Sequence, residues 1–526
     1  MREYYSVPFR MGFEEGGARS YMASYNAWNG VPMAVNPVLR DVVAKEWGAN
    51  WIVTPDAGAL NHVMDLHKYL PNMDEVYIAA LKVGVNQLGT GFGRGGEGRP
   101  LAETMKQALS EKRITEADID SAIRGKFLTV LKLGLLDPPE MVHRSKIAAA
   151  GEPDAATSEK HKQVARDVAH ESVVLLKNNA NFLPLNRSAL KSIAVVGPRA
   201  SAVLWDFYSG TTPYSISVLQ GIRDKVGAGI TVNAPASVDA AAAIQAAKSS
   251  DIAVVVVGND PMCGAANPGG AFNPDASTKP CLDKGEGREG RDRESIDLSQ
   301  EELIRQVFAA NPKTVVVLVS SFPCAISWTQ AKCAGYSAHH TRSTGTGHGH
   351  SRCSLRRLRS GWPSHANLAE VPRPVSAAAR LQHHYRPHIH VFQGRTALPL
   401  WIWTQLYEFP LLEPARDCFE TDAKGTVTLS VDVKNTGTRA GDEVVQLYAA
   451  WPGSKVTRPA KALKGFQRVS LKANESKTIQ IPVGADALSW WNPQTHGWEL
   501  EAGRVKLMVG TSSADVRAET TLDVRP

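Results

Sequence analysis

The pattern of hydrophobic and polar positions divides this 526-residue chain into regions of different texture. From residue 1 to about 150, short apolar runs end in polar or Gly-rich turns, and a helical repeat follows each of them. YMASYN precedes VNPVLRDVVAKEWG, WIVTPD precedes NHVMDLHKYL, and MDEVYIAALKVG is a further amphipathic stretch. A repeated order of strand, loop and helix is typical of parallel βα units.

A long helix is predicted from the stretch ITEADIDSAIRGKFLTVLKLGLLDPP. Thr115 and Asp118 stand before its apolar run with the spacing of a capping box. Gly134, followed by Pro138 and Pro139, marks its end.

Residues of about 155 to 330 repeat the βα theme with longer strands. KSIAVVGP, DIAVVVVGND and KTVVVLVSS are almost continuous β-branched runs, as in strands that are buried on both faces. SVDAAAAIQAAKSS and SQEELIRQVFAANP are the helices between them. A polar, Gly-rich insertion from Pro261 to Arg293 is long for a βα loop, and such loops are usually functional or disordered. Cys263 and Cys281 flank part of it, either as a disulfide or as free thiols.

Residues of about 415 to 526 alternate apolar and polar positions over short runs that turn residues separate. The runs are GTVTLSVDVKNTG, DEVVQLYAAW, ALKGFQRVSLK, SKTIQIPVGA and GRVKLMVGTS. This spacing predicts a seven-stranded β-sandwich of roughly 100 residues.

Composition narrows the class of protein. With 43% hydrophobic and 21% charged residues, the chain can bury sizeable cores, which excludes a wholly disordered or fibrous protein. No apolar run reaches the roughly 20 residues of a membrane helix, so we expect no membrane association. The first residues, MREYYSVPFRMGFEEGG, lack a signal-peptide pattern. Six cysteines are too few for a disulfide scaffold.

The net charge of +7 comes from one unusual segment. Residues 333 to 407 hold nine Arg, no Lys, a single acidic residue and nine of the fifteen His, so the rest of the chain is close to neutral. A nucleic-acid partner is therefore not expected. The segment has no usable periodicity, and it interrupts a domain that still lacks its last strands.

Several motifs together resemble glycoside hydrolase family 3. MASYNAWNGVP followed by EWGANWIVTPDAGAL is similar to the family's M-x-S-Y-N-x-x-N-G-x-P and E-W-G-F-x-G-x-V-V-S-D-x-x-A. REGRDRESIDLSQEELI resembles its E-G-x-D-R-x-x-L-x-L-P loop, and ESVVLLKNNANFLPL resembles the start of its second domain. VKNTGTRAGDEVVQLY is similar to the fibronectin-III-like domain that ends many members. The resemblance covers about 450 residues in the family's order.

The resemblance implies a multidomain fold. Residues 1–150 would be the C-terminal part of a (β/α)8 barrel, 151–410 an α/β sandwich domain, and 415–526 a fibronectin type III-like domain. A complete barrel takes about 250 residues, so the chain holds about half of one. The missing half would carry several of the family's sugar-binding groups.

The odd segment of about 333–408 is interpreted as translated out of frame. A set of codons for PLWIWTQLYEF, shifted by one nucleotide, reads PFGYGLSYTN, which resembles the family's signature at the end of the second domain. One direction of shift also gives family-like sequence for the rest of the segment. A genuine basic insertion is the alternative, and sequencing the coding DNA decides between them.

Asp56 ends the predicted strand WIVTPD and matches the family's nucleophile, with Thr54-Pro55 where Val-Ser is common. Chemistry in such barrels lies at the C-terminal strand ends, and a retaining glycosidase needs an ionised carboxylate as its nucleophile. Taken alone, an Asp at this place also suits a helix N-cap.

Glu289 stands three residues before Asp292 in the long polar loop, the spacing of the family's acid/base. That role requires a carboxyl that protonates the leaving oxygen and then activates water. Glu286 and Glu294 are competitors, and all three also suit solvated loop positions. The two catalytic carboxylates are expected about 5–5.5 Å apart.

Tyr25 matches a family tyrosine that lines the sugar site, and ordinary strand packing is its alternative. No cofactor is implied, and the G-x-G-x-G run in LGTGFGRGGEGRP is better explained as a flexible loop because no phosphate-binding Lys-Ser/Thr occurs. No metal site is expected, because the paired His residues lie in the out-of-frame segment.

The resemblance to glycoside hydrolase family 3 implies a retaining exo-β-glycosidase that acts on terminal non-reducing β-linked glucose or xylose. Its substrates would be oligosaccharides or aryl β-glycosides. An inactive remnant of such an enzyme, with an open sheet edge and exposed apolar surface, is the alternative. Family members are often secreted or periplasmic, but neither location nor oligomeric state follows from this sequence.

Overall fold

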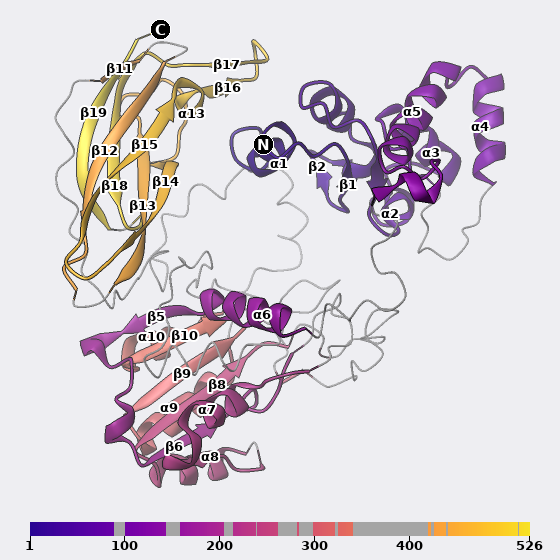
Figure 1. Ribbon diagram of the computed structural model, residues 1–526. Helices are drawn as coiled ribbons and strands as arrows, with labels where there is room; N and C mark the ends of the chain where they lie inside the picture. The colour runs from indigo at the N-terminus through magenta and orange to yellow at the C-terminus, as the bar shows by residue number, and fades with distance from the viewer. Residues whose placement is uncertain are drawn as a thin grey trace. The chain divides into compact units, whose positions relative to one another are not determined.

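A computed structural model describes residues 1–88, 100–143, 158–204, 214–237, 239–260, 263, 281–282, 298–320, 324–339, 419–421, 425–437, 440–513 and 515–525. These residues fall into two compact units, one up to His143 and one from Ser158 onward (Figure 1). The second unit contains an α/β part and a β-sandwich.

The first unit combines short strands with helices. Its elements are α1 (Val7–Glu14), β1 (Tyr21–Ala23), β2 (Ala27–Trp28), β3 (Val31–Pro32), β4 (Val53–Pro55), α2 (Ala59–Asp65), α3 (Met73–Lys82), α4 (Leu101–Ser110) and α5 (Glu116–Lys132). β1 and β4 are parallel neighbours, with Tyr21 opposite Val53. Ala23 and Val53 from these strands share a core with Val63 of α2 and Val76 of α3. The predicted parallel βα pairing is confirmed here.

The stretch VNPVLRDVVAKEWG departs from an α-helix, because Leu39–Ala44 forms a π-helix. The amide of Trp47 donates to the carbonyl of Val42, five residues earlier. This wider turn lets Val42, Val43 and Trp47 pack together with Phe13 of α1. The pattern of apolar positions predicted a helix here but not its pitch.

The α/β part is built on a six-stranded sheet of order β5-β10-β9-β8-β6-β7. Its elements are α6 (Glu159–Ser172), β5 (Val174–Asn178), β6 (Ser192–Val196), α7 (Val218–Val226), β7 (Thr231–Asn233), α8 (Ala240–Lys248), β8 (Ile252–Gly258), α9 (Glu301–Ala310), β9 (Thr314–Val319), α10 (Ser327–Lys332) and β10 (Gly335–His339). The three β-branched runs of the sequence are the adjacent parallel strands β9, β8 and β6. Only β5 runs antiparallel to its neighbour, at one edge.

Helices cover both faces of this sheet. Alternate residues of β8 enter two different cores: Ala253 packs in the one that α8 and α9 close, and Val254 in the one that α7 closes. All seven residues of β8 are buried, so the continuous apolar run reflects burial on both faces of the sheet, as predicted. The start of the odd segment supplies β10, which lies between β9 and β5. The rest of that segment lies outside the described residues.

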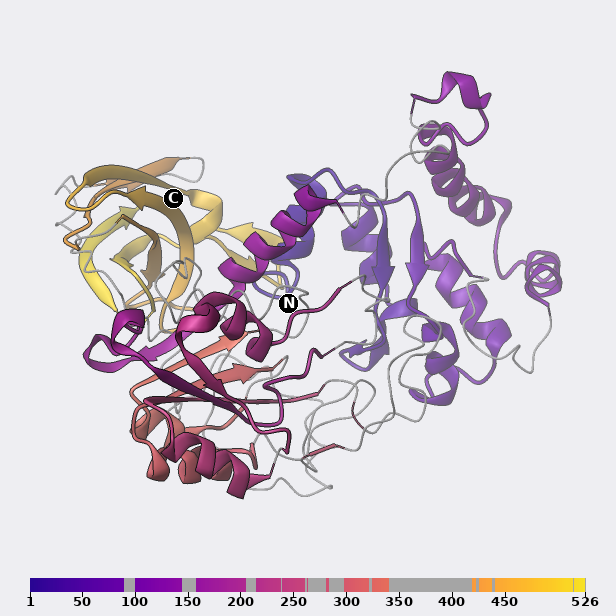
Figure 2. The ribbon, with the colours of Figure 1, turned by 60° about the horizontal axis from the view of Figure 1, so that its bottom comes forward.

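The C-terminal region is the predicted β-sandwich. Its elements are β11 (Phe419–Thr421), β12 (Thr426–Lys434), β13 (Gly441–Ala450), β14 (Ala462–Leu471), β15 (Ser476–Gly484), α13 (Ala485–Leu488), β16 (Trp490–Asn492), β17 (Gly497–Glu499), β18 (Gly503–Gly510) and β19 (Val516–Val524). A sheet of order β11-β19-β18-β13-β14 faces the pair β12-β15 across one core. Figure 2 shows the strands of this region, in orange to yellow, curving around a common interior. β16 and β17 form a separate hairpin.

Candidate active site

Asp56 lies where strand β4 turns into helix α2. Its backbone N–H donates to the carbonyl of Ala23 at the end of β1, at 2.9 Å, so the parallel pairing continues up to this residue. Its carboxylate accepts from the amide of Ala57 at 2.7 Å, and Gly58, with φ +76°, completes the turn. The half-buried carboxylate therefore stands at the C-terminal edge of two parallel strands.

Tyr25 lies beside the same turn. Its hydroxyl donates to the carbonyl of Ala57 at 2.7 Å, although 40% of the residue remains exposed. The hydroxyl of Tyr25 thus contacts the backbone of the residue that directly follows Asp56.

Two histidines that the sequence analysis did not single out surround Tyr25. The ring of His62 lies 5.4 Å from that of Tyr25, between ring centroids, and Nε2 of His67 lies 2.8 Å from the carbonyl oxygen of Tyr25. Nδ1 of His62 is 3.4 Å from the carboxylate of Asp65. The helical spacing of NHVMDLHKYL places these rings near the turn, but only the folded chain shows it.

Asn86 is a third residue whose role the sequence did not show. Its side-chain oxygen accepts from the amide of Val53 at 3.0 Å, and its side-chain nitrogen donates to the carbonyl of Trp51 at 2.7 Å. Its own backbone N–H donates to the carbonyl of Val53. Asn86 therefore completes the hydrogen bonds of the free side of β4, the strand that presents Asp56.

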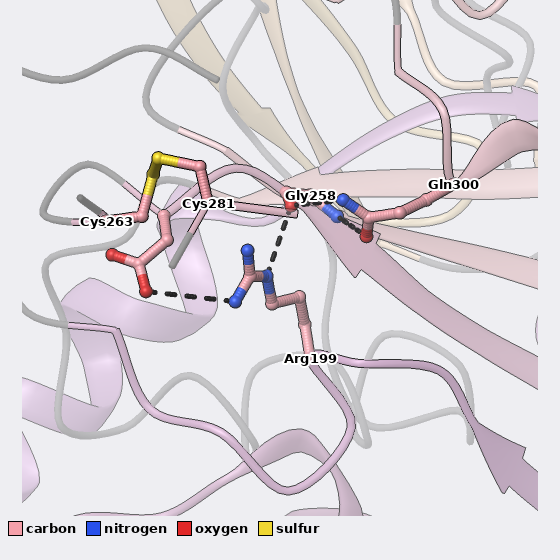
Figure 3. The surroundings of a disulfide bond; sticks show 6 residues. Arg199, Gly258, Cys263, Cys281 and Gln300 are labelled. Carbon is pink, nitrogen blue, oxygen red and sulfur yellow. Dashed lines mark hydrogen bonds and ion pairs between the residues drawn. A yellow bond between two sulfur atoms is a disulfide. The ribbon is translucent and has the colours of Figure 1, made fainter. Parts of the chain in front are cut away.

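Glu289 lies outside the described residues, as do its competitors Glu286 and Glu294. The structure describes the strand end from which this loop departs (Figure 3). There Cys263 and Cys281 form a disulfide, which decides between the two states that the sequence left open. Arg199 and Gln300 converge on Gly258 beside it.

Within the described residues, no three His, Cys, Asp or Glu side chains gather as ligands for a metal ion. No helix in that part of the chain is both long and apolar enough to cross a membrane. His339 lies in β10, and the other paired His residues fall outside the described part.

Two known sequence profiles match the second unit. Residues 173–352 match the Glycosyl hydrolase family 3 C-terminal domain, and residues 443–513 match a Fibronectin type III-like domain. A β-xylosidase of Formosa agariphila is 30% identical over 560 aligned positions, which include the whole of this chain and 72% of that protein. The chain belongs to glycoside hydrolase family 3. It is an O-glycosyl hydrolase.

Other family 3 relatives extend the match. A periplasmic β-glucosidase of Salmonella typhimurium is 26% identical across 98% of this chain and 68% of its own length. Among solved structures, a β-glucosidase of Erythrobacter marinus superimposes with a TM-score of 0.77 at 23% identity, over 99% of this chain and 69% of that one. A β-glucosidase of Listeria innocua, solved with isofagomine, superimposes with a TM-score of 0.75 at 22% identity. The match covers 98% of this chain and 70% of that one. The fold of this family 3 chain therefore resembles about seven tenths of each of these two solved chains.

Proposed function

We propose that this family 3 chain is a retaining exo-β-glycosidase that releases terminal non-reducing glucose or xylose from β-linked oligosaccharides and aryl glycosides. Residues 1–150 belong to a (β/α)8 barrel, 151–410 to an α/β sandwich domain with 333–408 out of frame, and 415–526 to a fibronectin type III-like domain. The observation that carries the proposal is the position of Asp56. Its carboxylate stands half-buried at the C-terminal end of a parallel strand, within the motif that resembles the family's nucleophile.

Asp56 attacks the anomeric carbon, and the bond from that carbon to the leaving oxygen breaks. Glu289 gives its proton to that oxygen, so the leaving group departs as an alcohol and a glycosyl ester of Asp56 forms. Glu289, now a carboxylate, takes a proton from water, and the water oxygen displaces Asp56. Two inversions at one carbon return the sugar with its β-configuration.

The surroundings of Asp56 support this role. The backbone N–H of Asp56 donates to the carbonyl of Ala23, which holds the backbone in place. The N–H of Ala57 donates to the carboxylate of Asp56, which orients the side chain. Asn86 holds β4 from its free side. Rigid placement matters, because a misplacement of about 1 Å can cost about 10²-fold in rate. The names of the relatives, β-xylosidases and β-glucosidases, indicate the substrate class.

The test is turnover of 4-nitrophenyl β-glucoside and β-xyloside, with the anomer of the product followed by NMR. Asp56→Asn keeps the size of the side chain and removes the nucleophile, so we expect kcat to fall on the order of 10⁴-fold. Asp120→Asn, an exposed carboxylate on α5, is the matched control and keeps full activity. A 2-deoxy-2-fluoro glycosyl fluoride should label the peptide that contains Asp56. Product released as the α-anomer, or labelling elsewhere, would contradict the proposal.

A non-catalytic remnant is favoured by one observation, the exposed apolar surface of the first unit. Of the 21 large hydrophobic residues exposed in the described part of the chain, 15 lie between Met1 and Met141. Aggregation of the purified chain without turnover of either substrate would support the remnant.

A further inference from the structure

Tyr25 contacts the chain at both ends of helix α2. Its hydroxyl donates to the carbonyl of Ala57, two residues before α2 begins, at 2.7 Å. Its backbone carbonyl oxygen lies 2.8 Å from Nε2 of His67, two residues after α2 ends. A carbonyl oxygen can only accept, so Nε2 of His67 carries the proton and donates it. Both the side chain and the main chain of Tyr25 are therefore held.

The end of helix α2 fixes the backbone that carries His67. The N–H of His67 donates to the carbonyl of His62 at 2.8 Å. The N–H of Tyr69 donates to the carbonyl of Val63 at 2.9 Å. Lys68, which lies between His67 and Tyr69, has a φ of +52°. This left-handed conformation commonly ends a helix, and a residue other than glycine keeps it only where its surroundings impose it.

The same helix also contacts the ring of Tyr25. The ring of His62, within α2, lies 5.4 Å from the ring of Tyr25 between centroids, at an angle of 54°. Nδ1 of His62 is 3.4 Å from the carboxylate of Asp65, one turn further along α2. Tyr25 thus has a hydrogen bond at each end of α2 and a ring contact between them.

A series of hydrogen bonds leads from His67 to the carboxylate of Asp56. His67 donates to the carbonyl of Tyr25, whose hydroxyl donates to the carbonyl of Ala57. The N–H of Ala57 in turn donates to the carboxylate of Asp56 at 2.7 Å. Because this last bond orients the carboxylate, a displacement of Tyr25 that turns Ala57 also changes the direction in which the carboxylate points.

We propose that His67 is a positioning residue for glycoside hydrolysis, which holds Tyr25 against Ala57 and thereby fixes the direction of the Asp56 carboxylate. The inference rests on the proposed function, in which Asp56 is the nucleophile. His67 is not itself a catalytic residue, because it acts through Tyr25. A hydrogen bond of this kind changes a rate by about 2- to 10-fold when its effect lies wholly in the transition state.

The experiment measures kcat and KM of the full chain for 4-nitrophenyl β-glucoside and β-xyloside after three substitutions of His67. His67→Ala removes the donor, His67→Gln places an N–H near the position of Nε2, and His67→Asn places one near Nδ1, short of Tyr25. His67 is exposed, so none of the three disturbs a core.

We expect His67→Ala and His67→Asn to lower kcat about 2- to 10-fold with KM changed by less than about 2-fold, because the bond acts in the transition state. His67→Gln should restore kcat to within about 1.5-fold of the unaltered chain, since it keeps the donor. Leu66→Ala, next to His67 and 68% exposed, is the matched control and keeps full activity. An unchanged kcat in His67→Ala, or equal losses in the alanine and glutamine variants, would overturn the inference.

A double variant tests whether His67 acts through Tyr25. Tyr25→Phe already removes the hydrogen bond to Ala57, so in that background His67→Ala should lower kcat by no more than about 1.5-fold. Losses that multiply in the double variant would mean that His67 acts by a route other than Tyr25, which contradicts the proposal.

Amide hydrogen exchange tests the contact without turnover. His67→Ala should exchange about 2- to 10-fold faster in the peptides that contain Tyr25 and Ala57, because their local opening becomes easier. His67→Gln should exchange like the unaltered chain, and peptides of the sandwich should not change in either variant. This pattern in a chain that hydrolyses neither glycoside would support the structural role of His67 while the proposed function fails. Unchanged exchange in an active chain would overturn the role of His67 alone.

Discussion

Single residues around Asp56 decide how its carboxylate is presented. The hydrogen bond from the Tyr25 hydroxyl to the carbonyl of Ala57 holds the residue after Asp56, the proposed nucleophile, against the segment that follows strand β1. The motif S-Y-N pointed to Tyr25 as a sugar contact. The structure adds a positioning contact that the sequence could not show, because Tyr25 and Ala57 are 32 positions apart.

Tyr25→Phe removes this hydrogen bond and keeps the ring next to His62. A hydrogen bond of this kind contributes about 0.5–1.5 kcal/mol, so we expect kcat/KM to fall about 2- to 10-fold. Tyr69→Phe, another exposed tyrosine of the same unit, is the control and should leave kcat/KM unchanged. Equal kinetics for Tyr25→Phe and the unaltered chain would show that the contact does not position Asp56.

At the scale of elements, helix α5 begins where the capping signal predicted. The hydroxyl of Thr115 accepts from the amide of Asp118 at 3.2 Å, and the carboxylate of Asp118 accepts from the amide of Thr115 at 2.8 Å. These bonds satisfy two of the N–H groups that a helix start leaves unpaired.

Thr115→Ala removes one half of this capping box. We expect the free energy of unfolding to fall by about 1 kcal/mol in urea titration, because the first turn loses an acceptor. Thr115→Ser keeps the hydroxyl and should retain most of that stability. A serine variant as unstable as the alanine variant would mean that the methyl group, and not the cap, stabilises this helix start.

The sheet of the α/β part contains a pH-dependent contact. The carboxylate of Asp251, just before β8, accepts from the amides of Lys191 and Ser192 at 2.7 and 2.9 Å, at the start of β6. The N–H groups of Lys191 and Ser192 lower the pKa of Asp251, since they stabilise its charged form.

A lowered pKa in the folded state means that the contact stabilises the protein above the unfolded pKa of about 3.9 and is lost as the pH falls through the folded value. Asp251→Asn keeps an acceptor oxygen but does not titrate. We expect its Tm to lie below that of the unaltered chain at neutral pH, with the difference closing below pH of about 4. A difference in Tm that stays constant over this range would contradict the role of the charge.

The whole molecule buries its apolar residues unevenly. The α/β part and the sandwich enclose extended cores. In the first unit, helix α5 packs only Ile119 and Ala122 against a small core, and its large apolar side chains Ile123, Phe127 and Leu131 are exposed. Ile123, Phe127 and Leu131 follow one another at intervals of four, so they form one stripe on that helix. Only Gly125 of α5 is buried.

This stripe, with Leu135 after it, predicts self-association of the chain and binding of a hydrophobic dye. The double substitution Leu131→Gln and Leu135→Gln should lower dye fluorescence and the apparent mass in light scattering, without lowering the Tm. Both side chains are more than half exposed, so little packing is lost. Leu463→Gln on β14, an exposed leucine outside the first unit, is the control. A monomeric chain that binds no dye would contradict this prediction.

The sequence by itself determined the elements and the family, because period, caps and motifs are local properties that neighbouring residues carry. The β-branched runs became the central strands, the alternating runs became the sandwich, and Asp56 stands at a strand end as predicted. Only the tertiary structure decided which distant residues form hydrogen bonds. Asn86 bonds to strand β4, Tyr25 bonds to Ala57, and both Arg199 and Gln300 bond to Gly258. It also decided that Cys263 and Cys281 are bonded. These contacts join residues that are 18 to 59 positions apart in the sequence. The local sequence around one partner does not identify the other, because the fold of the intervening chain decides which residues meet.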